Sequence, residues 1–159
     1  MRILALTLFV LCFYGETLNA SEITGRTIVI QGDIIKIDGQ VIQLLDIDAP
    51  ETYQICYHAN GQDFLCGDEA HIFLLDLIGT QQVVCSYDKL DQKDRPLATC
   101  FVGSKNLNRE MVKAGWALPF YGTKHYLKER DAAKAAKRGI WEGTFCEPRI
   151  LRRNECPAQ

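Results

Sequence analysis

Residues 26–47 alternate short runs of β-branched residues with turn signals, and this pattern limits the fold more narrowly than any other feature. The runs read "RTIVI", "IIKI" and "QVIQLLDI". Asp38 and Gly39 separate the last two runs. An Asp-Gly pair between two apolar runs is the strongest short-range signal for a β-hairpin. The segment therefore predicts three consecutive antiparallel strands.

A helix follows these strands within residues 67–79. Asp68 is its expected N-cap and Gly79 its expected end. The apolar side chains recur at i, i+3, i+4, i+7 and i+8, as one buried helix face requires: Ala70, Phe73, Leu74, Leu77 and Ile78.

Two more strands and two more helices complete the expected order. The strands are "QQVVCSYD" and "PLATCFV". Asn106 or Asn108 begins a short helix that Gly115 ends, and a longer basic helix ends at Gly139, after which Ile140 and Trp141 return to the core. Five short antiparallel strands with three helices predict an α+β fold built on a small closed β-barrel of the OB type.

The first twenty residues predict a secretory signal peptide. An apolar run from Ile3 to Tyr14 follows one basic residue, and the small Ala20 precedes Ser21. The run is shorter than the about 20 apolar residues that cross a bilayer, although an uncleaved anchor remains the alternative. We therefore expect a signal peptide at residues 1–20 and one domain at residues 21–159, secreted or periplasmic and without stable membrane association.

Six of the seven cysteines lie in the expected mature chain, and an even number in an exported protein indicates disulfides. Six cysteines allow 15 pairings. If the last two strands pair about a turn near Gln92 and Lys93, Cys85 faces Cys100. Pairing of Cys56 with Cys66 would close the loop before the first helix, which leaves Cys146 with Cys156 for the C-terminal segment.

Charge is divided unevenly along the chain. Residues 1–100 hold 6 basic and 14 acidic side chains, for a net charge of −8, whereas residues 101–159 hold 12 and 6, for +6. Such asymmetry is typical of proteins with an electrostatic partner such as a nucleic acid. A solvated basic helix face is the alternative explanation of the positive half.

Carboxylates gather where the third strand ends. Asp33 lies in the turn between the first two strands and Asp48 ends the third, so a small barrel brings both to one rim. Carboxylate and carbonyl oxygens are the ligands of hard cations such as Ca²⁺. Glu51, directly after Pro50, is placed to accept a proton from water. An ordinary turn role for Asp33 and a capping role for Glu51 are the alternatives.

At these residues the chain resembles the staphylococcal nuclease (thermonuclease) family, above all its disulfide-bearing secreted bacterial members. The order and spacing of the matching pieces, across residues 24–153, carry the resemblance. They read "QGDIIKIDGQVIQLLDIDAPE", "CGDEAHIFLLDLIG", "DQKDRPLATCFV", "NLNREMVKAGWAL" and "AAKAAKRGIWEGTF".

The resemblance implies an OB-type barrel and Ca²⁺-dependent hydrolysis of phosphodiester bonds in DNA and RNA. It assigns Asp33, Asp48 and the backbone carbonyl of Ala49 to the metal. Glu51 matches the residue that activates or positions the attacking water, and Arg95 matches one of two arginines that hold the scissile phosphate. Metal and guanidinium would neutralise charge on the phosphoryl oxygens while water attacks in line.

Gln43 departs from the family pattern, because it stands where the family has its second phosphate-binding arginine. Glutamine donates neutral hydrogen bonds without the charged fork of a guanidinium, so reduced activity is expected. Asp94 replaces a glycine before Arg95. Lys36 or Arg26 is a possible substitute cation from another strand. Strict strand alternation would separate Gln43 from Asp48 unless the chain bends near residue 46.

Aromatic residues after the second helix are candidates for stacking on nucleobases. For Trp116 core packing is the favoured role, whereas Phe120 and Tyr121 match a substrate-proximal stretch of the family. The sequence thus predicts an attenuated monomeric nuclease that acts on RNA and on single-stranded or denatured DNA. The alternative is a catalytically inactive nuclease-fold module that binds nucleic acid or another partner. A third hypothesis, a structural domain that only binds calcium, is less favoured because it does not explain why Glu51 and Arg95 accompany the aspartates.

Overall fold

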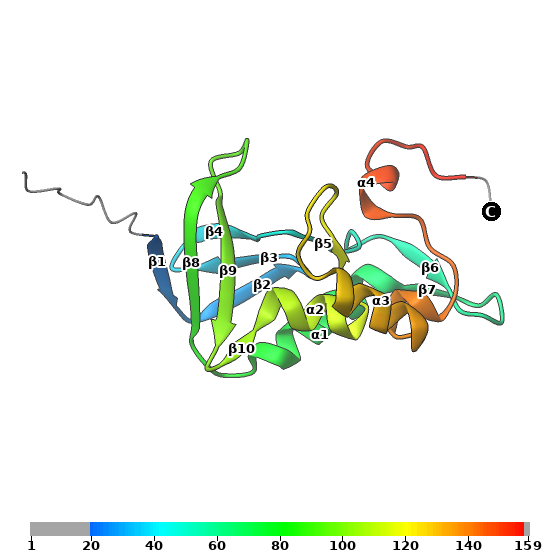
Figure 1. The fold of residues 1–159 in the computed structure, drawn as a ribbon, viewed down its shortest axis with the longest axis horizontal. Coiled ribbons are helices and arrows are strands. Elements are labelled where there is room, and N and C mark those ends of the chain that lie inside the picture. Colours follow the sequence, from blue (N-terminus) through cyan, green and yellow to red (C-terminus); the bar gives the residue numbers. More distant parts are fainter. Residues whose placement is uncertain (1–19, 158–159) are drawn as a thin grey trace, which may run out of the picture.

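A computed structural model describes residues 20–157 (Figure 1). The predicted signal peptide lies outside the described residues except for Ala20. Eleven strands occur within residues 20–157: β1 Ser21–Gly25, β2 Thr27–Gln31, β3 Ile34–Ile37, β4 Gln40–Leu44, β5 Ile47–Asp48, β6 Ile55–Tyr57, β7 Asp63–Leu65, β8 Val83–Leu90, β9 Pro96–Val102, β10 Lys105–Asn106 and β11 Leu118–Pro119. The helices there are α1 Cys66–Ile78, α2 Leu107–Ala114, α3 Leu127–Ala135, the 3-10 helix Gly139–Glu142 and α4 Pro148–Leu151.

The main sheet runs in the order β1-β8-β9-β4-β3-β2, with β10 added beside β9. The two edge strands of this sheet, β1 and β2, are consecutive in sequence and are separated only by Arg26. The chain bends between them, so the two edges of the sheet are close together and the sheet curls. The α+β, OB-type architecture expected from the sequence is confirmed. One pair, β4 with β9, is parallel instead of antiparallel, and the edge strand β1 was not predicted.

The predicted hairpin is present as β3 and β4. Asp38 and Gly39 form its turn with φ angles of 48° and 87°. Both angles lie in the left-handed region, which a tight hairpin turn requires and which aspartate and glycine tolerate.

Two predicted helix boundaries are wrong. The helix α1 begins at Cys66, so Asp68 lies inside the first turn, where a carboxylate favours the positive end of the helix dipole, and not at the N-cap. The helix α3 ends at Ala135, before Gly139, because Lys137 takes a left-handed φ of 51°. For α2, by contrast, the Asn106 side chain accepts from the Arg109 N–H, and Gly115 ends the helix as predicted.

The helices pack together on one side of the strands, whereas the C-terminal segment with α4 turns back toward β5 (Figure 1). The larger core cluster lies between the sheet, α1 and α2, and a smaller one surrounds the first disulfide. Trp116 packs against both clusters, in agreement with its expected core role. No helix within residues 20–157 has the length and apolar character to cross a membrane.

The structure pairs the six cysteines of the expected mature chain as anticipated. Cys85 and Cys100 stand directly opposite each other on β8 and β9 and form one disulfide. The others join Cys56 to Cys66 and Cys146 to Cys156. The last bond closes a loop that contains α4, an element that the sequence did not predict.

Asn108, a fully buried residue of α2, connects the helix to the strands. Its Nδ2 donates to the carbonyls of Leu45 at 2.9 Å and Ala98 at 3.0 Å, and its Oδ1 accepts from the Cys100 N–H at 3.0 Å. The helix thereby supports the chain where β4 ends.

Substitution Asn108→Ala should lower the free energy of unfolding by about 2–4 kcal/mol, because it leaves the Cys100 N–H and the Leu45 carbonyl without this partner, whereas the Ala98 carbonyl keeps its bond from the Leu45 N–H. Chemical denaturation of the oxidised protein measures this change. Lys105→Ala, at an exposed position nearby, should change the free energy of unfolding by less than about 0.5 kcal/mol. An equal effect of both substitutions would contradict the assigned role of Asn108.

Candidate active site

The turn between β2 and β3 holds Asp33 in the barrel wall. Gly32 lies so close to α1 that an added Cβ would meet the Cβ atoms of Ala49 and Ala70 at 2.9 Å. The Ala49 N–H donates to Asp33 Oδ2 at 3.2 Å. Asp33 is 4% exposed, and its Oδ1 has no hydrogen-bond partner among the described residues.

A bend at Asp46 brings the following strand alongside this turn. The strand β4 ends at Leu44, Asp46 has a φ of 64°, and β5 begins at Ile47. The bend that the alternation argument required is therefore present, and Asp48 is buried in the same wall as Asp33. The Gln43 side chain donates through Nε2 to the Asp33 carbonyl at 3.1 Å, so Gln43 fixes the Asp33 turn.

Glu51 is held by contacts with α1 and with Gln54, which lies in the loop directly after Glu51. An added Cβ on Gly67 would come within 1.8 Å of the Glu51 carbonyl, so only glycine allows this approach. The Gln54 N–H donates to that carbonyl at 2.7 Å, and the Gln31 side chain donates to Glu51 Oε2 at 3.3 Å.

Arg152, directly after α4, reaches the same carboxylates. Its Nη1 and Nη2 donate to the two oxygens of Asp48 at 2.9 and 3.0 Å, and Nη1 also donates to Glu51 Oε1 at 2.7 Å. The sequence analysis missed this residue. The only available signal was its position in the basic C-terminal segment between two cysteines, which does not indicate where the segment packs.

The pKa values of Asp33, Asp48 and Arg152 are all raised in the folded protein. Burial, reinforced by the charge of Asp48, raises the pKa of Asp33 to about 7, although the Ala49 and Gln43 hydrogen bonds oppose the rise. Burial also raises the pKa of Asp48, with Arg152 opposing it. The hydrogen bond to Asp48 is the main reason why the pKa of the Arg152 guanidinium is raised, and Glu51 adds to it.

The donor set at this rim fits a hard cation. Asp33 Oδ1 is a buried oxygen without a partner among the described residues, which is the kind of group that a bound cation satisfies. Within residues 20–157 no three histidine, cysteine, aspartate or glutamate side chains are grouped as a metal site. Two carboxylates, a backbone carbonyl and water are oxygen donors of the kind that Ca²⁺ accepts.

Arg95 forms an ion pair with Asp91. Its Nε donates to Asp91 Oδ2 at 2.7 Å, and no hydrogen bond joins it to Asp33, Asp48 or Glu51 among the described residues. Although burial opposes it, hydrogen bonding to Arg95 lowers the pKa of Asp91. Asp94 has a φ of 56°, in the left-handed region that glycine adopts most readily. This conformation explains why the family has a glycine at the position of Asp94. Lys36 and Arg26 also make no contact of this kind with the carboxylates of the described site.

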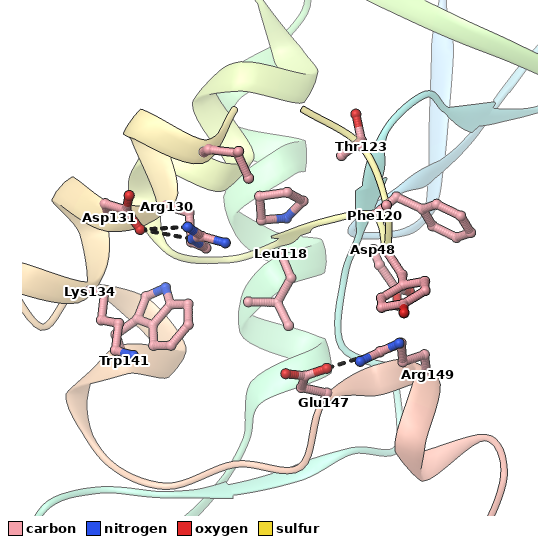
Figure 2. Close-up of a pocket in the computed structure, with 14 residues that line it drawn as sticks. Asp48, Leu118, Phe120, Thr123, Arg130, Asp131, Lys134, Trp141, Glu147 and Arg149 are labelled. Carbon is pink, nitrogen blue, oxygen red and sulfur yellow. Dashed lines mark hydrogen bonds and ion pairs between the residues drawn. The ribbon is translucent and has the colours of Figure 1, made fainter. Parts of the chain in front are cut away.

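A pocket of about 470 Å³ adjoins Asp48 between α3 and the C-terminal segment (Figure 2). Phe120 and Tyr121, which are 53% and 72% exposed, line it. The Arg149 guanidinium lies 4.2 Å from the centre of the Tyr121 ring. The remaining walls carry both signs of charge and a third aromatic ring, from Arg130, Asp131, Lys134, Trp141 and Glu147.

Residues 41–143 match the family described as staphylococcal nuclease homologue. The chain belongs to the staphylococcal nuclease family. It is 32% identical over 146 residues to the succinoglycan biosynthesis protein ExoI of Rhizobium meliloti, covering 87% of this chain and 76% of that protein. It is 30% identical over 118 residues to an uncharacterized endonuclease of Haemophilus influenzae, covering 72% and 61% respectively.

Substitution Asp33→Asn should stabilise the protein in chelator at pH 8. Asp33 has a pKa of about 7 in the fold against an ordinary 3.8, so the folded state loses relative stability as the pH rises between these values. At pH 8 the substitution removes a buried charge, which stabilises the fold, and introduces an unpaired amide, which costs about 1–3 kcal/mol. The net increase in the free energy of unfolding should be about 2 kcal/mol. At pH 4 Asp33 is already protonated in the fold, so the cost of the unpaired amide remains without the compensating gain, and the substitution should lower the free energy of unfolding by about 1–2 kcal/mol.

Denaturant titrations at the two pH values measure this difference. Asp63→Asn, on the exposed end of β7, serves as the control and should change stability little at either pH. A destabilisation by Asp33→Asn that is equal at pH 4 and pH 8 would show that the carboxylate carries no burial penalty.

Proposed function

We propose that this protein is an exported, Ca²⁺-dependent nuclease that hydrolyses phosphodiester bonds of DNA and RNA. Membership of the staphylococcal nuclease family supports a nuclease, and the relative from Haemophilus influenzae is named an endonuclease. The observation that carries the proposal is the convergence of Asp33 and Asp48 at one rim. Glu51 lies close enough to share a guanidinium with Asp48.

Asp33, Asp48 and the Ala49 carbonyl would hold the Ca²⁺. When bound, the ion would act as a Lewis acid toward the phosphoryl oxygens. Glu51 accepts a proton from a water molecule, whose oxygen forms the new bond to phosphorus. The bond between phosphorus and the leaving oxygen breaks, and solvent protonates that oxygen. Gln31, which hydrogen-bonds Glu51 at 3.3 Å, orients the carboxylate for this role.

The pocket beside Asp48 is the proposed path of the nucleic acid strand. Exposed rings at Phe120 and Tyr121 offer stacking surfaces, which suit unpaired bases of denatured DNA or RNA. Lys134 and Arg149 on the pocket wall provide positive charge for phosphates. We propose that one chain binds and cleaves the strand as a monomer.

The three disulfides support action outside the reducing cytoplasm, in the periplasm or after secretion. Two features support a reduced rate. Gln43 is neutral and bonds to a backbone carbonyl, and Arg95 is engaged by Asp91. Gln43 carries no charge and Arg95 makes no hydrogen bond to the carboxylates of the described site, so we propose that hydrolysis is attenuated relative to a site with two such arginines.

Hydrolysis of denatured DNA by the mature, oxidised protein should require Ca²⁺ and stop in chelator. Asp48→Asn should lower kcat by about 100-fold or more, because the substitution removes one of the two charged ligands that hold the ion. Asp63→Asn should retain the full rate. A fluorescent oligonucleotide that reports cleavage, together with a separate binding titration, distinguishes the outcomes. Metal-independent binding without cleavage would instead identify a nucleic-acid-binding module that has lost catalysis.

Substitution Gln43→Arg should raise kcat for denatured DNA about 10-fold, because it adds a charged donor beside the Asp33 turn. Gln43→Met, which keeps the length of the side chain without charge, should not raise it. An unchanged rate for Gln43→Arg in a protein that is otherwise active would contradict the proposed cause of attenuation.

A further inference from the structure

Arg152 lies in a loop whose position relative to the carboxylates is fixed at several points. The Cys146–Cys156 disulfide closes the loop. At its start, the Cys146 carbonyl accepts from Gln54 Nε2 at 2.8 Å. Gln54 is buried, and its own backbone N–H bonds to Glu51. One residue thus ties the start of the loop to the segment that carries Glu51.

The α4 helix then directs Arg152 toward the rim. Pro148 is buried at the first turn of the helix, where its fixed φ is favourable. The N–H groups of Ile150 and Leu151 donate to the Glu147 carbonyl at 2.9 and 3.0 Å. The Arg152 side chain remains 40% exposed, so its guanidinium can exchange partners without being extracted from the core.

The Arg152 guanidinium contacts two carboxylates with different proposed roles. Nη1 donates to Asp48, a proposed cation ligand, and to Glu51, the proposed proton acceptor. A phosphoryl group attacked by a water molecule held at Glu51, with a cation held at Asp48, would lie close to both of these side chains. Its oxygens would therefore come within reach of Arg152, whose planar fork matches a phosphate.

We propose that Arg152 is a phosphate-binding catalytic residue of this site, supplied by the loop closed by Cys146 and Cys156. The inference rests on the proposed nuclease function and gives it a guanidinium that neither Gln43 nor Arg95 offers. In the free protein Asp48 and Glu51 share the single positive charge of Arg152. With a cation held at Asp48, the guanidinium would be free to turn to the phosphoryl oxygens. Among residues 20–157, no other arginine hydrogen-bonds to these carboxylates.

The test measures binding and hydrolysis separately. Adenosine 5′-monophosphate with Ca²⁺ is titrated by calorimetry into the wild type, Arg152→Gln and Arg152→Lys, and hydrolysis of denatured DNA is followed for each. Arg152→Gln should weaken nucleotide binding about 10- to 100-fold and lower kcat by a similar factor. Arg152→Lys should be intermediate, because lysine keeps the charge without the fork. Arg153→Gln removes the same charge from an exposed neighbour and should behave as wild type.

A titration with Ca²⁺ alone distinguishes a phosphate role from a structural one. Arg152→Gln should bind Ca²⁺ as tightly as the wild type or more tightly, because a competing cation is gone. Weaker Ca²⁺ binding in parallel with the other losses would show that Arg152 only maintains the site, which overturns the proposal. So would unchanged nucleotide binding, or faster hydrolysis, in Arg152→Gln.

The outcomes for Arg152 and for the nuclease proposal are separable. A wild type that binds the nucleotide through Arg152 and cleaves nothing would support the phosphate site and refute hydrolysis. A wild type that cleaves DNA equally well with Arg152→Gln would support the nuclease and refute the inference. A wild type that does not bind the nucleotide in Ca²⁺ also refutes it.

Discussion

The burial of two carboxylates at one rim is the constraint on which the rest of the site depends. Removing charge from water costs several kcal/mol unless a partner compensates. Asp33 lacks a charged partner among the described residues and takes a raised pKa, whereas Asp48 is paired with Arg152. The structure therefore holds one carboxylate in an unfavourable environment and neutralises its neighbour, an arrangement typical of a functional site.

Two close backbone approaches make this arrangement possible. Gly32 and Gly67 each stand where a Cβ would overlap atoms of the chain segment from Ala49 to Glu51. The start of α1 and the Asp33 turn thus contact that segment directly, and Asn108 of α2 holds the chain before it through the Leu45 carbonyl. The carboxylates are positioned mainly by main-chain packing, which explains how the two-residue strand β5 and the segment directly after it can hold Asp48 and Glu51 in place.

Local signals in the sequence predicted the elements well. The Asp38–Gly39 turn, the five principal strands and the limits of α2 follow from rules that act within a few residues. The boundaries of α1 and α3 were wrong because a backbone break at Lys137 and packing at Cys66 outweighed the capping residues. Arg152 could not be predicted at all. Its contact with Asp48 spans more than a hundred positions and depends on α4, whose four residues carry no periodic pattern.

The bent segment of β1 and β2 has a consequence for the order of folding. Ser21 pairs with Tyr87, whereas β2 pairs with the nearby β3. A chain that emerges N-terminus first can form the β2–β3–β4 meander early, but β1 has no partner until β8 is available. Joining segments so distant in sequence costs loop-closure entropy and slows folding. We expect closure of the barrel to be a late event, during which an unpaired edge is open to association with other chains.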